Sequence, residues 1–360
     1  MKKILSLVLV LCLVLSLGAC KKADDNNKAS DGYEIALVTD VGNIDDKSFN
    51  QGAWEGVKKY AEDNKKTYNY YRPSEDSTEA RVETIKQAID KGAKVVVCPG
   101  YLFEEAIYEI QDQFSATQFL LLDGEPHDAD YNYKTSANTH NILYKEEQAG
   151  YLAGYAAVKE GYRKLGFLGG MAVPAVIRYG YGFVQGANAA AEELGVAGDV
   201  SVKYWYCGGF APTDDIKTKM SAWYTDGTEV IFSCGGGIYL SCTAAAEAAG
   251  KKVIGVDVDQ SAESATIITS AMKELANSVV LALTDLYKNN GTWPADLGGK
   301  TSTLGAVENC VGLPTATWSM KNFTVDEYKV LFEKVKNGTI AISNATDAAP
   351  AVSIAVDYQE

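Results

Sequence analysis

The chain has 360 residues, of which 47% are hydrophobic, and this is enough for two domains of ordinary size or one large one. Its formal net charge of −14 argues against a nucleic-acid partner, because phosphate backbones are bound by clustered Lys and Arg side chains. With only two histidines and no clustered cysteines, the composition offers no zinc ligand set, and we expect neither a metal nor another cofactor.

Residues 1–19 have the pattern of an export signal, with two lysines before the apolar run 4–17 and then small residues. That run is too short to span a membrane comfortably. Cys20 follows directly, and the junction resembles the bacterial lipoprotein signal, in which the cysteine is lipidated and becomes the new N-terminus. The alternative is an ordinary signal peptide with a chance cysteine. Residues 20–32 are polar, cannot build a core and are predicted to form a flexible tether.

The apolar run Ile35–Val38 is predicted to be a buried strand, and residues 49–64 are predicted to form a helix. Between them, residues 39–50 read TDVGNIDDKSFN, which places carboxylates beside the aromatic ring of Phe49. Open α/β sheets bind their ligands at the carboxyl ends of parallel strands. Carboxylates beside a ring suit a flat, uncharged ligand rich in hydrogen-bonding groups, whereas they would repel a phosphate.

Each residue of this junction also has a purely structural interpretation. Asp40 and Asp45 could cap the following helix, and Asp46 is expected to cap or to be exposed rather than to bind a ligand. Phe49 could pack onto the core beside the helix start.

Strand and helix signals alternate through the rest of the chain, which predicts stacked βαβ units. The predicted strands are 34–39, 68–71, 94–98, 118–122, 133–137, 164–168, 200–205, 229–233, 252–256 and 266–269. The predicted helices between them are 77–91, 104–113, 145–160, 180–194, 213–225, 239–249 and 273–288. Ten strands would be unusual in one sheet, so we expect two halves joined near residues 140–145.

The five cysteines beyond Cys20 form an odd set without a CxxC spacing, so no disulfide framework is expected. Cys98 and Cys234 end apolar strand-like runs and are predicted to lie in the core.

Six segments carry a further signal: DVGNIDDKSFNQGAWEG (40–56), EEQAGYLAGYAA (146–157), KLGFLGG (164–170), GFVQGANAA (182–190), VIGVDVDQ (253–260) and TSAMK (269–273). In this order they resemble the basic membrane protein family, which comprises lipoprotein substrate-binding subunits of ABC importers similar to the purine nucleoside receptor. The resemblance implies an α/β fold with two Rossmann-like lobes and a hinge, the type I periplasmic-binding-protein architecture. On this basis the N-terminal lobe comprises residues 33–141 and about 272–312. The C-terminal lobe comprises residues 142–271 and about 313–345, and residues 346–360 form a C-terminal tail.

Carried over by position, the resemblance implies a set of ligand-binding residues: Asp40, Asn43, Phe49, Asn50, Asp123, Phe210, Gly236, Asp257 and Lys273. Phe49 and Phe210 would sandwich a nucleobase, with Trp205 and Tyr206 as alternatives to Phe210. Asp123 would bind the base edge and Asp257 the ribose.

Two features of the matched segments depart from the family. Asn43 stands where the family usually has a second glycine. The segment between Asp257 and Lys273 is short.

No catalytic constellation accompanies these residues, so we do not expect an enzyme. Residues 270–273 match the SxxK pattern of penicillin-binding enzymes, but neither SDN nor KTG accompanies it. The glycines at 235–237 are not followed by GK[ST], which rules out a P-loop; a close backbone approach to an uncharged ligand is the better interpretation.

The sequence therefore predicts a monomeric, lipid-anchored receptor on the extracytoplasmic face of the cell membrane. It would capture a nucleoside, with a purine nucleoside favoured, and present it to the permease and ATPase subunits of an ABC importer. A sugar or quorum-signal receptor of the same fold is the first alternative. A surface adhesin or a hydrolase would be an alternative of another class.

Overall fold

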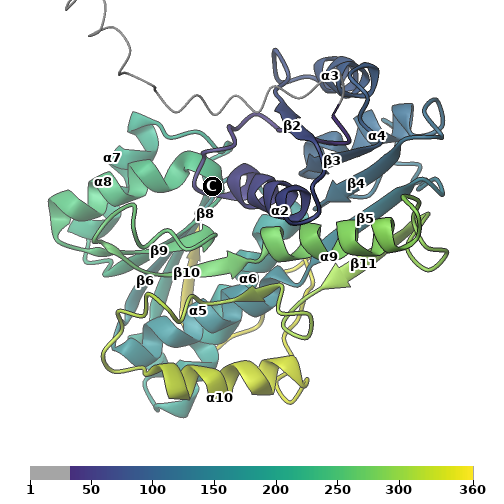
Figure 1. Ribbon diagram of the computed structural model, residues 1–360. Coiled ribbons are helices and arrows are strands. Elements are labelled where there is room, and N and C mark those ends of the chain that lie inside the picture. Colours follow the sequence, from purple (N-terminus) through teal and green to yellow (C-terminus); the bar gives the residue numbers. More distant parts are fainter. Residues whose placement is uncertain (1–32, 360) are drawn as a thin grey trace, which may run out of the picture. The chain divides into compact units, whose positions relative to one another are not determined.

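The structure is a computed structural model and describes residues 33–359 (Figure 1). The predicted signal peptide, Cys20 and the tether lie outside the described residues. Within residues 33–359, none of the helices combines the length and the apolar character needed to cross a membrane.

The first lobe is built on a parallel sheet with the strand order β11-β5-β4-β3-β1-β2. Its strands are β1 (Ile35–Val38), β2 (Tyr68–Tyr71), β3 (Val95–Pro99), β4 (Gln118–Leu122), β5 (Thr139–Tyr144) and β11 (Lys300–Leu304). The central strands are buried on both sides because helices cover both faces of the sheet. One face packs against α2 (Phe49–Asp63) and α9 (Leu275–Lys288), which lie side by side in Figure 1, and the other against α3 (Thr78–Asp90) and α4 (Glu104–Ile110).

The second lobe repeats this plan around a sheet with the order β12-β10-β9-β8-β6-β7-β13. Its strands are β6 (Lys164–Gly169), β7 (Ser201–Tyr206), β8 (Val230–Cys234), β9 (Lys252–Asp257), β10 (Ile267–Lys273), β12 (Val311–Gly312) and β13 (Ala355–Tyr358). Strand β12 runs antiparallel to β10, and the other described pairs are parallel. One face packs against α5 (Glu146–Glu160), α6 (Pro174–Glu193) and α10 (Val325–Lys336), and the other against α7 (Asp214–Thr225) and α8 (Tyr239–Ala249).

The two lobes share one topology. The order β2-β1-β3-β4-β5 in the first sheet corresponds to β7-β6-β8-β9-β10 in the second. This is a doubly wound order, in which the direction of winding reverses between β1 and β3 and between β6 and β8, and ligands bind at that switch point. The predicted α/β fold with two Rossmann-like lobes is confirmed.

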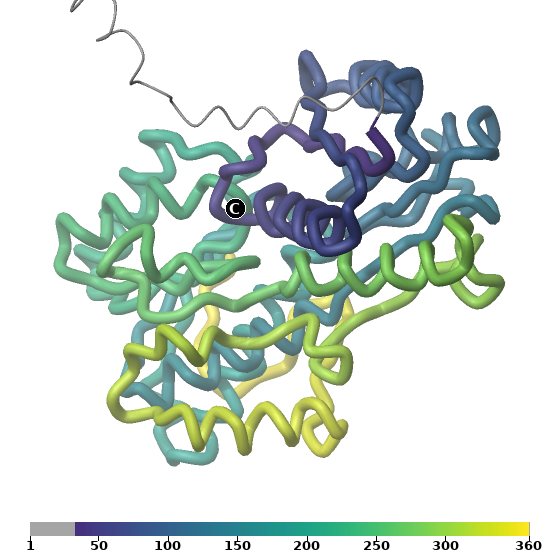
Figure 2. The backbone as a smooth tube through the Cα atoms, viewed as in Figure 1, coloured from purple at the N-terminus to yellow at the C-terminus, as the bar shows by residue number. Residues whose placement is uncertain are grey.

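Within residues 33–359 the chain crosses between the lobes three times: after β5 at residue 145, after β10 at residue 274, and between β11 and β12. Figure 2 shows the result, with a green segment from late in the sequence running beside the purple and blue chain of the first lobe. The observed boundaries differ from the predicted ones at three places. The first lobe runs to Tyr144 instead of residue 141, β12 belongs to the second sheet, and β13 lies within the range predicted as a tail.

The predicted strand 133–137 is wrong, and β5 follows it at Thr139–Tyr144. The backbone N–H of Ser136 donates to the Gln111 side chain (2.9 Å), so this stretch bonds to a side chain instead of a neighbouring strand. Strand β5 escaped prediction because it carries buried polar residues. His140 Nδ1 donates to the carbonyls of Leu297 and Lys300, both at 3.0 Å, which satisfies its buried ring.

The structure also contains elements that were not predicted, and helices α6 and α9 begin at other residues than expected. Strands β11, β12 and β13 and helix α10 were not predicted, and α6 begins at Pro174, six residues before the predicted start at 180. Helix α9 begins at Leu275, because Lys273 is the last residue of β10. Cys98 and Cys234 lie in the core, as predicted.

Helices α5 and α6 pack backbone to backbone through four glycines. A Cβ atom on Gly150 or Gly154 of α5 would lie 2.1 Å from the carbonyl oxygen of Tyr179 or Phe183. Reciprocally, a Cβ on Gly182 or Gly186 of α6 would lie 2.2 or 2.0 Å from a carbonyl oxygen of α5. This contact accounts physically for the glycines of two of the six matched segments, and it fixes the position of the first turns of both helices behind the cavity described next.

Candidate functional site

A cavity of about 710 Å³ lies between the lobes, within the range of roughly 300–1,000 Å³ that is typical of small-molecule sites. Its wall is formed largely by loops at the carboxyl ends of the parallel strands of both sheets, where the topology places ligand sites. The wall contains all nine residues named from the sequence: Asp40, Asn43, Phe49, Asn50, Asp123, Phe210, Gly236, Asp257 and Lys273. Trp205 and Tyr206 are not part of this wall.

Phe49 begins α2 and lies beside a bare stretch of backbone at Gly100. A Cβ atom on Gly100 would lie 3.7 Å from Phe49 Cε1 and 3.7 Å from Asp40 Oδ2. Gly100 has φ +109°, a conformation that favours glycine. A ring edge, a carboxylate oxygen and exposed backbone therefore meet at one point of the wall.

Asn50 and Asp46 hold the loop that carries these groups. The Asn50 amide donates to Asp40 Oδ1 (2.7 Å) and Asp46 Oδ2 (2.9 Å), and its oxygen accepts from the Asp40 backbone N–H (3.1 Å). Asp46 also accepts from the backbone N–H groups of Ser48 (2.8 Å) and Asn50 (3.0 Å), so it caps α2 as predicted. Burial raises the pKa of Asp40, and its Oδ2 has no hydrogen-bond partner among the described residues.

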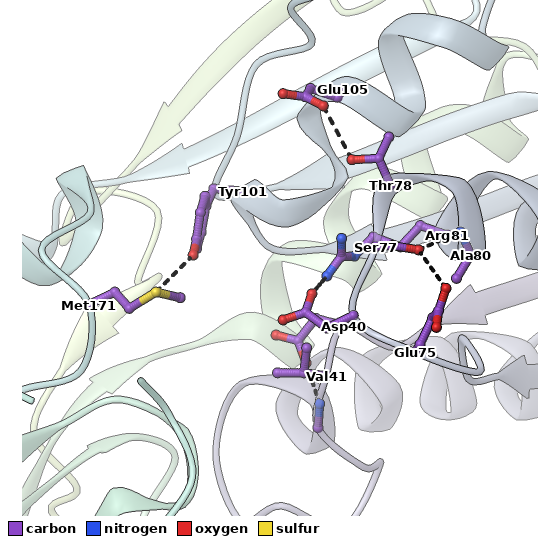
Figure 3. A network of polar contacts seen from close by, with 12 residues as sticks. Asp40, Val41, Glu75, Ser77, Thr78, Ala80, Arg81, Tyr101, Glu105 and Met171 are labelled. Carbon is purple, nitrogen blue, oxygen red and sulfur yellow. Dashed lines mark hydrogen bonds and ion pairs between the residues drawn. The ribbon is translucent and has the colours of Figure 1, made fainter. Parts of the chain in front are cut away.

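Figure 3 shows the polar network at the first-lobe end of the cavity. Arg81 of α3 is buried and forms an ion pair with Asp76. Asn43 Oδ1 accepts from Arg72 (2.6 Å), so this amide oxygen is already used within the first lobe. Tyr101, which follows β3, points across to Met171 of the second lobe, with its hydroxyl 3.6 Å from the sulfur.

Lys273 ends β10 and lies at the centre of a buried cluster. Its ammonium group donates to Asp123 Oδ2 across the lobes and lies 3.0 Å from Glu146 Oε1. Arg178 of α6 donates from Nε to Glu146 Oε2 (2.6 Å). Three rings surround the ammonium group at centroid distances of 4.8 to 5.5 Å, those of Phe49, Tyr144 and Tyr179.

Burial and neighbouring charges shift the pKa values of this cluster in opposite directions. Burial raises the pKa of Asp123 to about 7, although Lys273 opposes the shift. Burial would lower the pKa of Lys273, but Asp123, Glu146 and Asp257 outweigh it and hold that pKa above its ordinary value. Lys273 therefore remains a cation that is fully surrounded by carboxylates and rings.

Asp257 ends β9 on the second lobe and has a left-handed backbone (φ +65°), as Asp123 has at the end of β4 (φ +59°). Burial raises the pKa of Asp257 to about 6, against the opposing effects of Lys273 and a hydrogen bond from Ser48. Two non-glycine residues in this uncommon conformation, both carboxylates and both in the cavity wall, indicate that the surrounding structure holds them there.

Phe210 follows β7, and its ring packs directly against the backbone of Gly170 and Gly235. A Cβ atom would lie 2.3 Å from its Cε1 if placed on Gly170, and 2.7 Å from its Cδ1 if placed on Gly235. The Gly237 N–H donates to the Phe210 carbonyl (2.8 Å). The glycine turn thus approaches this ring closely, and its three glycines also belong to the cavity wall.

Sequence reasoning missed several residues of the site. Glu146, Arg178 and Tyr179 lie within helices, where acidic or basic residues are common and carry no strand-end signal. The SxxK match at residues 270–273 does not form a serine nucleophile with its lysine base. The Ser270 hydroxyl is buried and accepts from the Gln260 N–H (3.1 Å), and Lys273 is paired with carboxylates instead.

Two doubly wound lobes, three crossings between them and a cavity at their facing strand ends define the fold of the periplasmic-binding-protein class. Solved structures agree on this fold. An ABC transporter solute-binding protein from Aeropyrum pernix superposes with a TM-score of 0.73 and 20% identity over 88% of this chain and 94% of that one. A second, from Conexibacter woesei, gives a TM-score of 0.67 and 20% identity over 87% and 99%.

The sequence profile of the family described as "ABC transporter substrate-binding protein PnrA-like" (Bmp) matches residues 34–346, and the chain belongs to this family. The "ABC transporter nucleoside-binding protein BmpA" of Lactococcus lactis is 28% identical over 87% of this chain and 92% of its own. A "CD4+ T-cell-stimulating antigen" of Listeria monocytogenes is 30% identical over 94% and 97%. The protein is thus a substrate-binding protein of an ABC transporter, extracytoplasmic and membrane-associated, and not an enzyme.

Proposed function

We propose that this protein is a lipid-anchored receptor that binds a nucleoside, with purine nucleosides preferred, and presents it to the permease and ATPase of an ABC importer. One observation carries the proposal: the wall of a single cavity includes the phenyl rings of Phe49 and Phe210, one from each lobe, together with the carboxylates of Asp40, Asp123 and Asp257. The relative from Lactococcus lactis is named a nucleoside-binding protein, which supports the same ligand class.

The aromatic rings and the carboxylates contribute to ligand recognition in different ways. Stacking on an aromatic ring contributes roughly 1–3 kcal/mol per base and tolerates different bases, since every base has a π-face. Carboxylates accept hydrogen bonds from base N–H groups and ribose hydroxyl groups, and such charge-assisted bonds are the stronger kind. We assign the base edge to Asp123 and the ribose to Asp257, as the family resemblance implies.

The charge of the cavity favours an uncharged ligand. Seven carboxylates and three cationic side chains belong to its wall. Each of the three cations is already paired with a carboxylate: Arg81 with Asp76, Arg178 with Glu146, and Lys273 with Asp123. A phosphate group would therefore meet a wall with excess negative charge and no unpaired cation.

Ligand binding is expected to hold the lobes together, and the closed form is what the permease would bind. The receptor is proposed to act as a monomer, because both rings and all three carboxylates come from one chain.

A calorimetric titration with inosine, guanosine, adenosine and a panel of hexoses tests the ligand class. We expect dissociation constants in the micromolar range or below for nucleosides, unchanged ligand recovered by native mass spectrometry, and no hexose binding. Hexose binding without nucleoside binding would assign the cavity to a sugar. Release of a cleaved product would indicate a hydrolase, and retention of no small molecule would favour an adhesin.

The lipid anchor has its own test. Cys20→Ser should move the protein from the membrane fraction to the soluble extracytoplasmic fraction, because one residue supplies the lipidation site. A variant that stays in the membrane fraction to the same extent would remove the anchor from the proposal.

A further inference from the structure

Glu146 lies behind the cavity wall, at the crossing between the lobes. It is the first residue of α5, directly after the chain leaves the first lobe, and its side chain is fully buried. The cavity wall does not include it. Any influence on a bound molecule must therefore act through the residues that Glu146 contacts.

Its two ion-pair partners among the described residues are both cations of the cavity wall. Glu146 Oε2 accepts from Arg178 Nε at 2.6 Å, and Glu146 Oε1 lies 3.0 Å from Lys273 Nζ. Lys273 and Arg178 belong to the cavity wall. One buried carboxylate therefore binds both cationic side chains that the second lobe contributes to the wall.

The charge state of Glu146 suits this role. Burial alone would raise its pKa, but Lys273 and Arg178 together outweigh burial and hold the pKa below its ordinary value. Glu146 is therefore ionised at neutral pH, and its negative charge lies against both cations.

We infer that Glu146 is a positioning residue that sets the charge specificity of the cavity. By holding Arg178 and Lys273, it leaves no cation free for an anionic group, so the receptor accepts uncharged nucleosides and rejects their 5′-phosphates. The part of this inference that concerns nucleosides rests on the proposed function. The part that concerns the free cation does not depend on the ligand class.

A purely structural role makes a different prediction. A buried ion pair that only stabilises the fold would, when broken, lower the melting temperature and weaken all ligands by the same factor. A residue that neutralises two cations of the wall changes the ratio between anionic and neutral ligands. The ratio therefore separates the two roles.

The test uses Glu146→Gln, which keeps the size of the side chain and removes its charge. We expect inosine to bind about tenfold more weakly, since members of one ion-pair network couple by about that amount. We expect the affinity for inosine 5′-monophosphate relative to inosine to rise by about tenfold or more, because the wall gains one unpaired positive charge. Glu193→Gln, which breaks the partly exposed pair with Lys159 on the outer side of α6, serves as the control and should leave the ratio unchanged.

A second variant identifies the cation. In Glu146→Gln/Arg178→Met the uncompensated guanidinium is removed, so the ratio should return toward that of the wild type. If the ratio stays at the wild-type value in Glu146→Gln, or if the second substitution does not reverse a change, the inference is overturned.

Inorganic phosphate gives a readout that does not require nucleoside binding. At equal ionic strength, phosphate should raise the melting temperature of Glu146→Gln relative to chloride and leave that of the wild type unchanged. Failure of inosine to bind the wild type would overturn the proposed function, whereas an absent phosphate effect would overturn the role of Glu146. If Glu146→Gln does not fold, Glu146→Asp replaces it; its shorter carboxylate should retain the charge and reject phosphate as the wild type does, and acceptance of phosphate by this variant would count against the inference.

Discussion

The hydroxyl of Ser48 donates a 2.5 Å hydrogen bond to Asp257 Oδ2, which joins two lobes through residues 209 positions apart. The Gln260 amide supports the same contact by donating to the Lys47 carbonyl at 2.7 Å. Asp257 Oδ1 has no hydrogen-bond partner among the described residues. One oxygen of this carboxylate thus holds the lobes together, and the other is available to a ligand.

Ser48→Ala should weaken nucleoside binding without uncapping α2. A hydrogen bond to a charged group contributes about 1.5–3 kcal/mol, so we expect at least a tenfold rise in the dissociation constant by calorimetry. Ser48 precedes α2, but its hydroxyl makes no capping bond, so the helix loses nothing. The matched control is Ser77→Ala, which removes the real cap of α3 and should lower the melting temperature with little effect on binding. Equal binding by wild type and Ser48→Ala would show that this contact does not contribute to the liganded state.

Phe49→Ala and Phe210→Ala should each weaken inosine, guanosine and adenosine by similar factors. The loss should be roughly 1–3 kcal/mol per ring, because stacking does not depend on the identity of the base. Trp205→Ala is the control, since Trp205 is on the second lobe but outside the cavity wall. A loss confined to one nucleoside would mean that the ring contacts a substituent instead of the base plane.

Gly170→Ala should displace the Phe210 ring and so lower affinity. The new methyl group would lie 2.3 Å from Phe210 Cε1, so the ring must move. Gly209→Ala, in the same region, meets no atom within 4 Å and should bind as the wild type does. Calorimetry and thermal melting of both variants provide the comparison. Wild-type affinity in Gly170→Ala would contradict the assignment of Phe210 to the binding site.

Stability should depend on pH through Asp257. Burial raises the pKa of Asp257 to about 6 from an ordinary value of 3.8, so between these values the folded protein binds more protons than the unfolded chain. The contribution of this group to the free energy of unfolding therefore falls as pH rises from about 4 through 6.

Asp257→Asn removes this contribution. It should raise the free energy of unfolding at pH 8 by on the order of 1–3 kcal/mol and change it little at pH 4, while weakening ribonucleoside binding. Asparagine tolerates the left-handed backbone at this position. Asp226→Asn, at an exposed carboxylate, should give the same small difference at both pH values. Denaturant titrations of the three proteins at the two pH values measure the effect, and a parallel shift for Asp257→Asn would refute it.

Gly154→Ala should destabilise the second lobe. Its methyl group would lie 2.1 Å from the Phe183 carbonyl oxygen, and backbone cannot give way as a side chain can, so we expect a loss of about 1–3 kcal/mol or more. Gly198→Ala meets no atom within 4 Å and should stay within about 0.5 kcal/mol of the wild type. Chemical denaturation of the two variants tests the claim. Equal stability of both variants would contradict the close helix packing.

The sequence predicted those parts of the fold whose signal is local. Strands β1, β3 and β4 are continuous apolar runs because both faces of their sheet are buried, and this pattern is visible without a partner. Strand β5 contains His140 and Asn141, whose bonding partners lie about 160 positions away near residue 300. Strand β12 has only two residues. Its pairing with β10 depends on the crossing between β11 and β12, which no local sequence pattern predicts.

The same distinction between local sequence signals and tertiary contacts applies to the site. Asp40, Asp123 and Asp257 follow or end predicted strands, and doubly wound sheets bring such positions together, so their convergence could be inferred. Glu146 looks like an ordinary acidic residue in a first helical turn. Only the packing of α5 against α6 and β10 reveals that it binds two cations. The role of Gly170 likewise depends on a ring that arrives from a different segment of the chain.

The three crossings between the lobes have a consequence for how the protein forms during synthesis and export. Helix α9, which covers one face of the first sheet, starts at Leu275, and edge strand β11 ends at Leu304. Both emerge only after β6 to β10 of the second lobe. Until then Val57 and Ala61 of α2 lack the apolar partners that α9 supplies. The first lobe, although its synthesis begins first, therefore completes its core only after β6 to β10 of the second lobe have been made, and the second lobe in turn waits for α10 and β13.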